Sequence, residues 1–225
     1  MRQKYIFIGP PGSGKGTQTK MLSKDLNLPH IDTGSLLREA VASGSEEGKL
    51  ANSFMEKGQL VPIDVVSKII KNRLLQDDAQ DGFILDGYPR STEQAYALDK
   101  ILDEIDEDKE IAPKVFYFDV PEDKLIERLV NRRTCQDCGS IYNLKTMQQV
   151  VNDNSKCPKC GGKLVRRDDD TEEVAKKRFE TYFKETAPLI DLYKSRNQLI
   201  DIDASLNIKI IYSNLRGAIR EYVNS

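Results

Sequence analysis

A glycine-rich loop near the N-terminus constrains this chain more than any other feature. Residues 5–8 form a short apolar run typical of a buried strand, and residues 9–17 follow it with the sequence GPPGSGKGT. Glycines at such a junction let successive backbone N–H groups curl inward onto an anion, and the helix expected from Lys15 points its positive end at the same place. The segment therefore predicts a phosphate-binding loop in which Lys15 supplies a point charge.

One detail of the loop departs from the usual phosphate-loop pattern. Gly16 stands directly after the lysine, where Ser or Thr is usual, and Thr17 comes one residue later. A glycine-rich turn that binds no ligand is the alternative, but the strand before the loop and the helix after it argue against that reading. The residues expected to contact nucleotide phosphates are Gly12, Ser13, Gly14, Lys15, Gly16 and Thr17.

Strand-like and helix-like hydrophobic patterns alternate along most of the chain. Strands are expected at residues 5–8, 29–32, 82–86, 115–119 and 199–203. Helices are expected at residues 15–26, 33–42 with Thr33 as the cap, 45–57, 62–76, 91–107, 121–133, 171–195 and 205–223. Strands alternating with helices indicate an α/β fold in which helices flank both faces of a parallel five-stranded sheet.

The overall charge excludes some classes of partner. The chain of 225 residues has 34 basic and 36 acidic side chains and a net charge of −2, so nucleic acid or an anionic membrane is not expected as its main partner. No apolar run approaches the roughly 20 residues of a membrane span, and the apolar stretch after Lys4 is too short for a secretory signal. We expect a cytoplasmic location.

The four cysteines form two pairs within residues 134–167, where the alternation of strands and helices stops. Their spacing, C-x₂-C-x₁₈-C-x₂-C, lies within the range of structural zinc ribbons. Four thiolates would leave no open position on the metal, so it could not activate water. Iron or a pair of disulfides are the alternatives to zinc. The expected ligands are Cys135, Cys138, Cys157 and Cys160.

Several motifs in a fixed order carry a resemblance to a known family. They are GPPGSGKGTQ at 9–18, TGSLLR at 33–38, LDGYPR at 85–90 with Gln94 after it, RRTCQDC at 132–138, RDDD at 167–170 and the distal Arg178. These segments cover essentially the whole chain. The chain resembles the adenylate kinases, which are nucleoside monophosphate kinases, in the long form with a four-cysteine zinc-binding lid.

The resemblance implies Mg²⁺-dependent, reversible transfer of a phosphoryl group from ATP to AMP, giving two ADP. It implies ATP binding by the loop residues with Arg128, Arg132 and Tyr142. It implies AMP binding by Thr33, Gly34, Arg38, Leu60, Val61, Gly87, Arg90, Gln94, Arg167 and Arg178. Catalytic roles are expected for Lys15, Arg90, Arg132, Arg167 and Arg178. Gln94 would read the adenine edge, which favours AMP over UMP or CMP.

The resemblance also implies a division of a phosphate-loop NTPase-type fold into segments. These are the core at 1–31, a small helical AMP-binding segment at 32–62, the core again at 63–133, an inserted zinc-ribbon-like lid at 134–167, and the core at 168–225. A monomer is expected. The alternatives are a UMP/CMP kinase and, from another class, a phosphate-loop switch or nucleic-acid-binding protein with a zinc ribbon.

Two positions depart from the family pattern. Ser35 stands where the family usually has an acid. By resemblance, that acid helps to orient the water shell of Mg²⁺. Its absence leaves Asp86, at the end of an apolar strand, as the main candidate for that role. Asn143 follows Tyr142 where a histidine is common, and an asparagine stacks less well on adenine. Donor affinity or base selectivity is therefore expected to differ.

Overall fold

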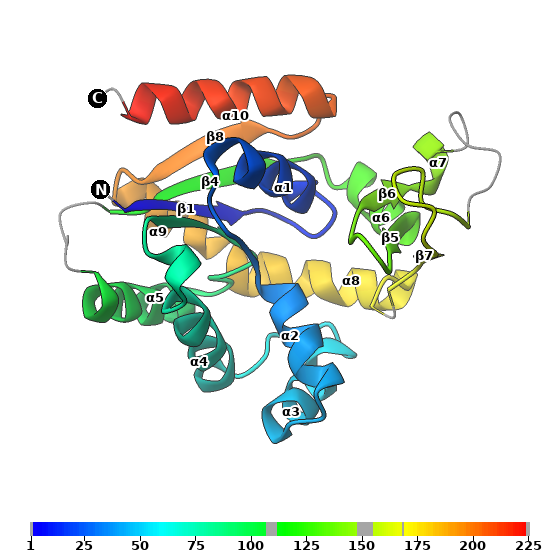
Figure 1. The fold of residues 1–225 in the computed structure, drawn as a ribbon, viewed down its shortest axis with the longest axis horizontal. Helices are drawn as coiled ribbons and strands as arrows, with labels where there is room; N and C mark the ends of the chain where they lie inside the picture. Colours follow the sequence, from blue (N-terminus) through cyan, green and yellow to red (C-terminus); the bar gives the residue numbers. More distant parts are fainter. Residues whose placement is uncertain (1, 107–111, 148–154, 168, 224–225) are drawn as a thin grey trace.

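A parallel five-stranded sheet lies at the centre of the computed structural model, which describes residues 2–106, 112–147, 155–167 and 169–223 (Figure 1). Its strands are β1 (Gln3–Ile8), β2 (His30–Asp32), β3 (Gly82–Asp86), β4 (Lys114–Asp119) and β8 (Leu199–Asp203), in the spatial order β2-β3-β1-β4-β8. Every neighbouring pair in this sheet is parallel. The expected α/β class with five parallel strands is confirmed.

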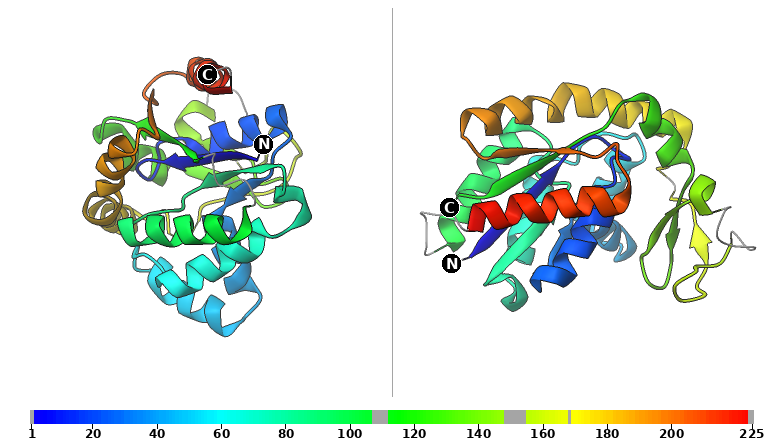
Figure 2. Two further views of the ribbon diagram at one scale, coloured as in Figure 1. Left: turned by 90° about the vertical axis from the view of Figure 1, so that its left-hand side faces the viewer. Right: turned by 90° about the horizontal axis from the view of Figure 1, so that it is seen from above.

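Helices cover both faces of the sheet (Figure 2). The covering helices are α1 (Lys15–Leu26), α4 (Ile63–Leu74), α5 (Thr92–Ile105), α6 (Asp123–Val130), α8 (Glu172–Thr181), α9 (Pro188–Ser195) and α10 (Ile208–Val223), with a short 3₁₀ turn at Asp77–Ala79. Helices α2 (Thr33–Ala42) and α3 (Glu46–Met55) lie apart from the sheet faces, and Leu37, Ala51 and Val61 form a small core of their own there. None of the helices in the described ranges combines the length and the apolar character that a membrane crossing requires. Residue 107, which ended the helix expected at 91–107, lies outside the described residues.

The core has two layers because successive side chains of a strand point to opposite faces of the sheet. On one face Phe7 stacks on Phe116 with ring centroids 5.1 Å apart, and α1, α6, α8 and α10 cover this layer. On the other face Ile6, Ile8 and Leu85 pack under α4, α5 and α9. Burying each such side chain contributes about 1.5–3 kcal/mol, which holds the strand ends in fixed positions relative to one another.

Most helix boundaries differ by one to three residues from the sequence-based expectations, and two of these differences bear on the site. The cap of α2 is Asp32 rather than Thr33, because the Asp32 carboxylate accepts the backbone N–H of Gly34. Helix α6 ends at Val130 rather than near Arg133, since the next residues pair into a strand. Arg132 therefore lies on that strand and not on the helix.

The single helix expected at 171–195 is interrupted by a π-helical turn, Tyr182–Thr186, between α8 and α9. Pro188 has no backbone N–H with which to continue the α-helical hydrogen-bond ladder. The N–H of Ala187 instead bonds the carbonyl of Tyr182 at 2.9 Å, five residues back. The widened turn lies beside the strand ends that form the site described below.

A second, antiparallel sheet holds the four cysteines and lies beyond the end of the central sheet (Figure 1). It contains β5 (Arg132–Cys135), β6 (Ile141–Asn143) and β7 (Leu164–Val165) in the order β6-β5-β7, with the short helix α7 (Leu144–Met147) after β6. Pairing of Arg132 with Asn143 places the start of this sheet two residues before the expected boundary at 134. The expected lid also includes residues 148–154, which lie outside the described residues.

Candidate functional site

A cleft of about 960 Å³ opens at the carboxyl ends of the central strands. In a parallel α/β sheet this edge is where ligands bind. Its walls include the phosphate loop, α2, the link before α4, the end of β3 and the second sheet. Among its lining residues are all those expected to contact the two nucleotides: Gly12, Ser13, Gly14, Lys15, Gly16, Thr17, Thr33, Gly34, Arg38, Leu60, Val61, Asp86, Gly87, Arg90, Gln94, Arg128, Arg132, Tyr142, Arg167 and Arg178.

The phosphate loop is wrapped around the side chain of Lys15. Its Nζ donates hydrogen bonds to the carbonyl oxygens of Gly9 (2.8 Å) and Pro10 (3.0 Å) and to Ser13 Oγ (3.1 Å). Gly14 caps α1 with φ of 92°, a left-handed conformation that glycine adopts without strain. The loop thus presents a concave backbone, and the partners of the lysine among the described residues are carbonyl and hydroxyl groups of the loop itself.

The charge of Lys15 is unusually easy to lose. Burial, opposed by the charge of Asp86 and reinforced by the positive charges of Arg90, Arg178 and Arg132, lowers the pKa of Lys15 from 10.5 to about 8. A phosphate group at this position would bring negative charge and reverse the shift. The site is therefore prepared for an anion that the protein itself does not supply.

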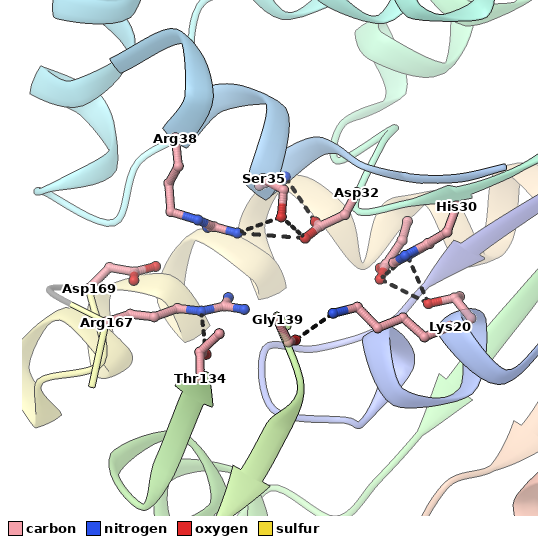
Figure 3. Close-up of polar contacts among 12 residues, drawn as sticks. Lys20, His30, Asp32, Ser35, Arg38, Thr134, Gly139, Arg167 and Asp169 are labelled. Atoms are coloured by element: carbon pink, nitrogen blue, oxygen red, sulfur yellow. Dashed lines mark hydrogen bonds and ion pairs between the residues drawn. The ribbon is translucent and has the colours of Figure 1, made fainter. Parts of the chain in front are cut away.

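Arginines from distant segments meet on the opposite wall of the cleft. Arg132 forms a bidentate pair with Asp170, whose side chain is fully buried, and Arg178 Nη1 lies 2.9 Å from Asp169 Oδ2. Arg167 Nε donates to Thr134 Oγ1 at 3.2 Å (Figure 3). Such pairs hold the guanidinium planes in place before a ligand arrives.

The arginine cluster carries more positive charge than these carboxylates neutralise. The pKa of Arg178 is lowered to about 10 by burial, with Asp169 opposing the shift and Arg132 and Arg90 adding to it. Burial likewise lowers the pKa of Arg167 to about 10, with Arg132 and Arg38 as the main repelling neighbours. Both groups stay protonated near neutral pH, so the wall attracts polyanions.

Arg90 and Gln94 are locked together at the start of α5. Gln94 is 5% exposed, and its Oε1 accepts the backbone N–H of Arg90 at 2.8 Å. The Arg90 side chain donates from Nε to the Gly87 carbonyl at 2.7 Å. One of the two acceptor positions of the Gln94 oxygen is thus used, so the amide nitrogen is the main group expected to contact a purine edge.

Asp86 ends β3 at the bottom of the cleft and is 6% exposed. Its Oδ2 lies 3.3 Å from both Thr19 Oγ1 and His30 Nε2, and Thr19 and His30 are themselves 2.9 Å apart. These contacts leave the carboxylate at the floor of the cleft beside the phosphate loop. Mg²⁺ prefers such oxygen ligands and keeps several waters, so the donor set suits the role expected for Asp86.

Asp32 is a cleft residue that sequence reasoning missed. Its Oδ1 accepts Gly34 N–H at 3.0 Å, and its Oδ2 accepts the hydroxyl of Ser35 at 2.5 Å (Figure 3). Burial pushes the pKa of Asp32 upward, but the Ser35 hydrogen bond and the charge of Arg38 outweigh it and hold that pKa below its usual range. The signal available in the sequence was an acid at the end of the strand that precedes TGSLLR. Asp169, which also lines the cleft, falls within the motif RDDD but was given no role of its own.

The four cysteines converge in the second sheet. Their sulfur atoms all lie within 4.8 Å of one another, with 3.5 Å between Cys135 and Cys160 and 3.7 Å between Cys138 and Cys157. Sulfurs bound at about 2.3 Å to one tetrahedral zinc lie about 3.8 Å apart, whereas a disulfide needs about 2.05 Å. The arrangement suits one closed four-sulfur metal site.

Neighbouring donors favour the thiolate form of two of these cysteines. The hydroxyl and N–H of Ser140 lower the pKa of Cys138 to about 6. The Tyr142 hydroxyl lies 3.3 Å from Cys157 Sγ. Tyr142 also lines the nucleotide cleft, so the cysteine cluster and the cleft share a side chain.

Comparisons with known proteins agree on one family. The family model described as adenylate kinase matches residues 7–198. The adenylate kinase of Thermosipho africanus is 44% identical over 215 residues, covering 96% of this chain and 98% of that protein. That of Archaeoglobus fulgidus is 45% identical over 220 residues, covering 98% and 99%. That of Methanocella arvoryzae is 44% identical over 218 residues, covering 97% and 99%.

Proposed function

This chain belongs to the adenylate kinase family, and we propose how its residues divide the transfer of a phosphoryl group from ATP to AMP. As a nucleoside monophosphate kinase it is a phosphotransferase whose substrates are ATP, AMP and ADP. The observation that carries the division is the cleft, in which Lys15 and the phosphate loop face a wall of arginines. Two polyanions need such a set of cations before they can approach each other.

The donor nucleotide belongs on the side of the phosphate loop. Backbone N–H groups of Gly12 to Thr17 would hold its phosphates, with Arg128, Arg132 and Tyr142 on its other side. The acceptor AMP belongs on the side of α2 and α5. Its phosphate would lie against Arg38 and Arg90, its adenosine against the loop of Leu60 and Val61, and its base edge against Gln94. The other residues of that side are Thr33, Gly34, Gly87, Arg167 and Arg178.

Catalysis in this proposal consists of positioning and charge neutralisation. No protein nucleophile is required, because the acceptor phosphate attacks in line. Lys15, Arg90, Arg132, Arg167 and Arg178 surround the place where the migrating group would pass. Their side chains are oriented by the carbonyl, carboxylate and hydroxyl partners described above, so they need little reorganisation when charge develops. Adenylate kinases use Mg²⁺ with their nucleotide, and the ion supplies further charge neutralisation when bound.

The proposed division into segments assigns 1–31, 63–133 and 168–225 to the core, 32–62 to AMP binding and 134–167 to the lid. The lid brings Arg167, on the segment returning from β7, to the cleft. A closed lid would exclude water, which competes with AMP as acceptor. A zinc ion on the four cysteines would stabilise the lid without taking part in chemistry.

We further propose that the protein is a monomer in the cytoplasm and that neither nucleic acid nor a membrane is its partner. A reducing compartment keeps thiols free to bind metal, and the net charge of −2 gives no general attraction to polyanionic surfaces.

The test is a coupled assay with ATP·Mg²⁺ and a panel of acceptors containing AMP, UMP, CMP and GMP at equal concentration. AMP is expected to be phosphorylated fastest, and two ADP are expected for each ATP consumed. Faster phosphorylation of UMP or CMP would overturn the assignment of Gln94 and of the acceptor side.

A further inference from the structure

Asp32 and Asp86 are the last residues of neighbouring parallel strands and are register partners across β2 and β3. Register partners of a parallel pair point to the same face of the sheet. Both residues line the nucleotide cleft. Their negative charges act on a shared neighbour: burial lowers the pKa of Arg90, and the charges of Asp32 and Asp86 both oppose that shift. Two carboxylates therefore lie side by side at the edge of the sheet where nucleotide phosphates are expected.

A pair of carboxylates opposes the binding of a polyanion unless a cation stands with it. At about 4 Å, a carboxylate and a phosphate oxygen near a protein surface repel by several kcal/mol. Without a cation, the two carboxylates would therefore weaken nucleotide affinity. The pKa of Asp32 lies below its usual range, so this carboxylate is ionised at neutral pH. Bound Mg²⁺ keeps several waters, and the hydrogens of those waters need acceptors.

Ser35, which replaces the acid usual in the family, is hydrogen-bonded to one member of the carboxylate pair, Asp32. The hydroxyl at position 35, where the family usually has an acid, donates to Asp32 Oδ2 at 2.5 Å and accepts from Arg38 Nη2 at 3.1 Å (Figure 3). The carboxylate that position 35 lacks is thus present three residues earlier, hydrogen-bonded to the side chain of residue 35. The ion pair of Asp32 with Arg38 is looser, with 3.6 Å between Oδ2 and Nη2.

We propose that Asp32 is a second positioning residue for the hydration shell of the nucleotide-bound Mg²⁺, acting with Asp86 in place of an acid at position 35. The proposal rests on the function proposed above for the cleft. Asp32 would act through water and not on the migrating group. In the alternative role, Asp32 would orient Arg38 toward the AMP phosphate. That role predicts weaker AMP binding with unchanged metal affinity when Asp32 is replaced.

The variant Asp32→Asn tests the proposal. Asparagine is as good a helix cap as aspartate, so α2 is retained while the charge is lost. Paramagnetic resonance with Mn²⁺ as the probe would measure metal affinity for the enzyme–ATP complex. That affinity is expected to fall about tenfold or more, as for other residues that orient a metal's ligands. The affinity for metal-free ATP is expected to be unchanged or higher, and the affinity for AMP unchanged.

Two further variants sharpen the test. Asp32→Asn combined with Ser35→Asp returns an acid to the pair and is expected to restore Mn²⁺ affinity. Asp64→Asn, on the exposed face of α4, is the matched control and is expected to change nothing. Weaker AMP binding with unchanged Mn²⁺ affinity would overturn the proposal in favour of the Arg38 role, and unchanged affinities for both would overturn it outright. Failure of the unmodified enzyme to prefer AMP would instead overturn the function proposed for the cleft.

Discussion

Lys20 Nζ donates a hydrogen bond to the carbonyl oxygen of Gly139 at 2.6 Å, so the helix that follows the phosphate loop contacts the first cysteine pair of the lid (Figure 3). Gly139 has φ of 63°, and this left-handed turn belongs to the loop that carries Cys138. Burial lowers the pKa of Lys20, and Arg167 adds to the shift while Asp32 opposes it. The contact joins the cysteine-bearing second sheet to α1, on the side of the cleft proposed for the donor.

Removal of this contact should loosen the lid. Lys20→Met keeps the length of the side chain but loses a charge-assisted hydrogen bond, which is worth about 1.5–3 kcal/mol. Faster hydrogen exchange is expected in residues 132–147 and 155–167, with the central sheet unchanged. Lys24→Met, an exposed position on the same helix, is the control. Equal lid exchange in the two variants would mean that the contact does not hold the lid.

The low pKa of Lys15 predicts proton uptake when ATP binds. With a pKa of about 8 in the free protein, half of the lysine is neutral at pH 8, and the triphosphate should raise that pKa again. Binding at pH 8 should therefore take up about half a proton, and binding below pH 7 very little. Calorimetry in buffers of different ionisation enthalpy measures the uptake. No uptake at pH 8 would contradict this account of the lysine's environment.

The same shift acts on stability in the absence of nucleotide. The folded-state pKa is below the unfolded value of 10.5, so burying the ammonium is unfavourable below pH 8. Between pH 8 and about 10.5 the folded protein releases the proton while the unfolded chain keeps it, so this penalty disappears as the pH rises. Lys15→Met should remove both the proton uptake on ATP binding and this pH-dependent penalty.

The same variant, Lys15→Met, should also lower turnover by about 10²–10³-fold with the fold intact, because a positive charge that stabilises the transition state is lost. Near-normal turnover would contradict the assignment of the phosphate loop.

Gln94→Glu separates recognition of the base from local structure. A glutamate oxygen can still accept the N–H of Arg90, but the amide donor expected to contact adenine is gone. The KM for AMP should rise about tenfold, the effect of about 1.4 kcal/mol, with a smaller change in kcat and in melting temperature. Gln94→Leu also leaves the backbone N–H of Arg90 without its acceptor, so this variant should lower the melting temperature as well. An unchanged KM for AMP in the glutamate variant would remove Gln94 from base recognition.

Removal of the metal should destabilise the lid before the core. The lid cluster contains Cys135, Cys157 and Leu164 as its buried residues, with Tyr142 against it, which is too little apolar area to fold a small unit alone. Metal binding is coupled to folding in such units. About one zinc per chain is expected in reduced protein. Chelation should lower the melting temperature, by about 2–4 °C for each kcal/mol lost, and reduce activity through Arg167.

Metal analysis with melting curves before and after chelation checks this prediction. The central sheet has its own core, so its exchange rates should change least. Cys157→Ser should reproduce the effect of the chelator. Protein that is reduced and metal-free, or that exchanges its metal without any change in melting, would contradict the structural role of the site.

Features set by neighbouring residues could be predicted from the sequence. The phosphate loop is a contiguous strand, glycine turn and helix, and α1 begins and ends where its pattern predicted, at Lys15 and Leu26. The cysteine pairs are close in sequence within each knuckle, so their spacing indicated a shared metal site that the sulfur distances support. Local backbone preferences and hydrophobic periods act over a few residues, and these features need no more than that.

Contacts between distant segments were decided only by the tertiary structure. Asp32 lies beside Asp86 because β2 pairs with β3, and Arg132 meets the buried Asp170 because β5 starts where a longer α6 was expected. No local pattern records which strand becomes the neighbour of which, since strand order follows from how helices pack both faces of the sheet. The local sequence therefore determined the phosphate loop and its lysine. Packing of the whole sheet determined which carboxylates lie beside them.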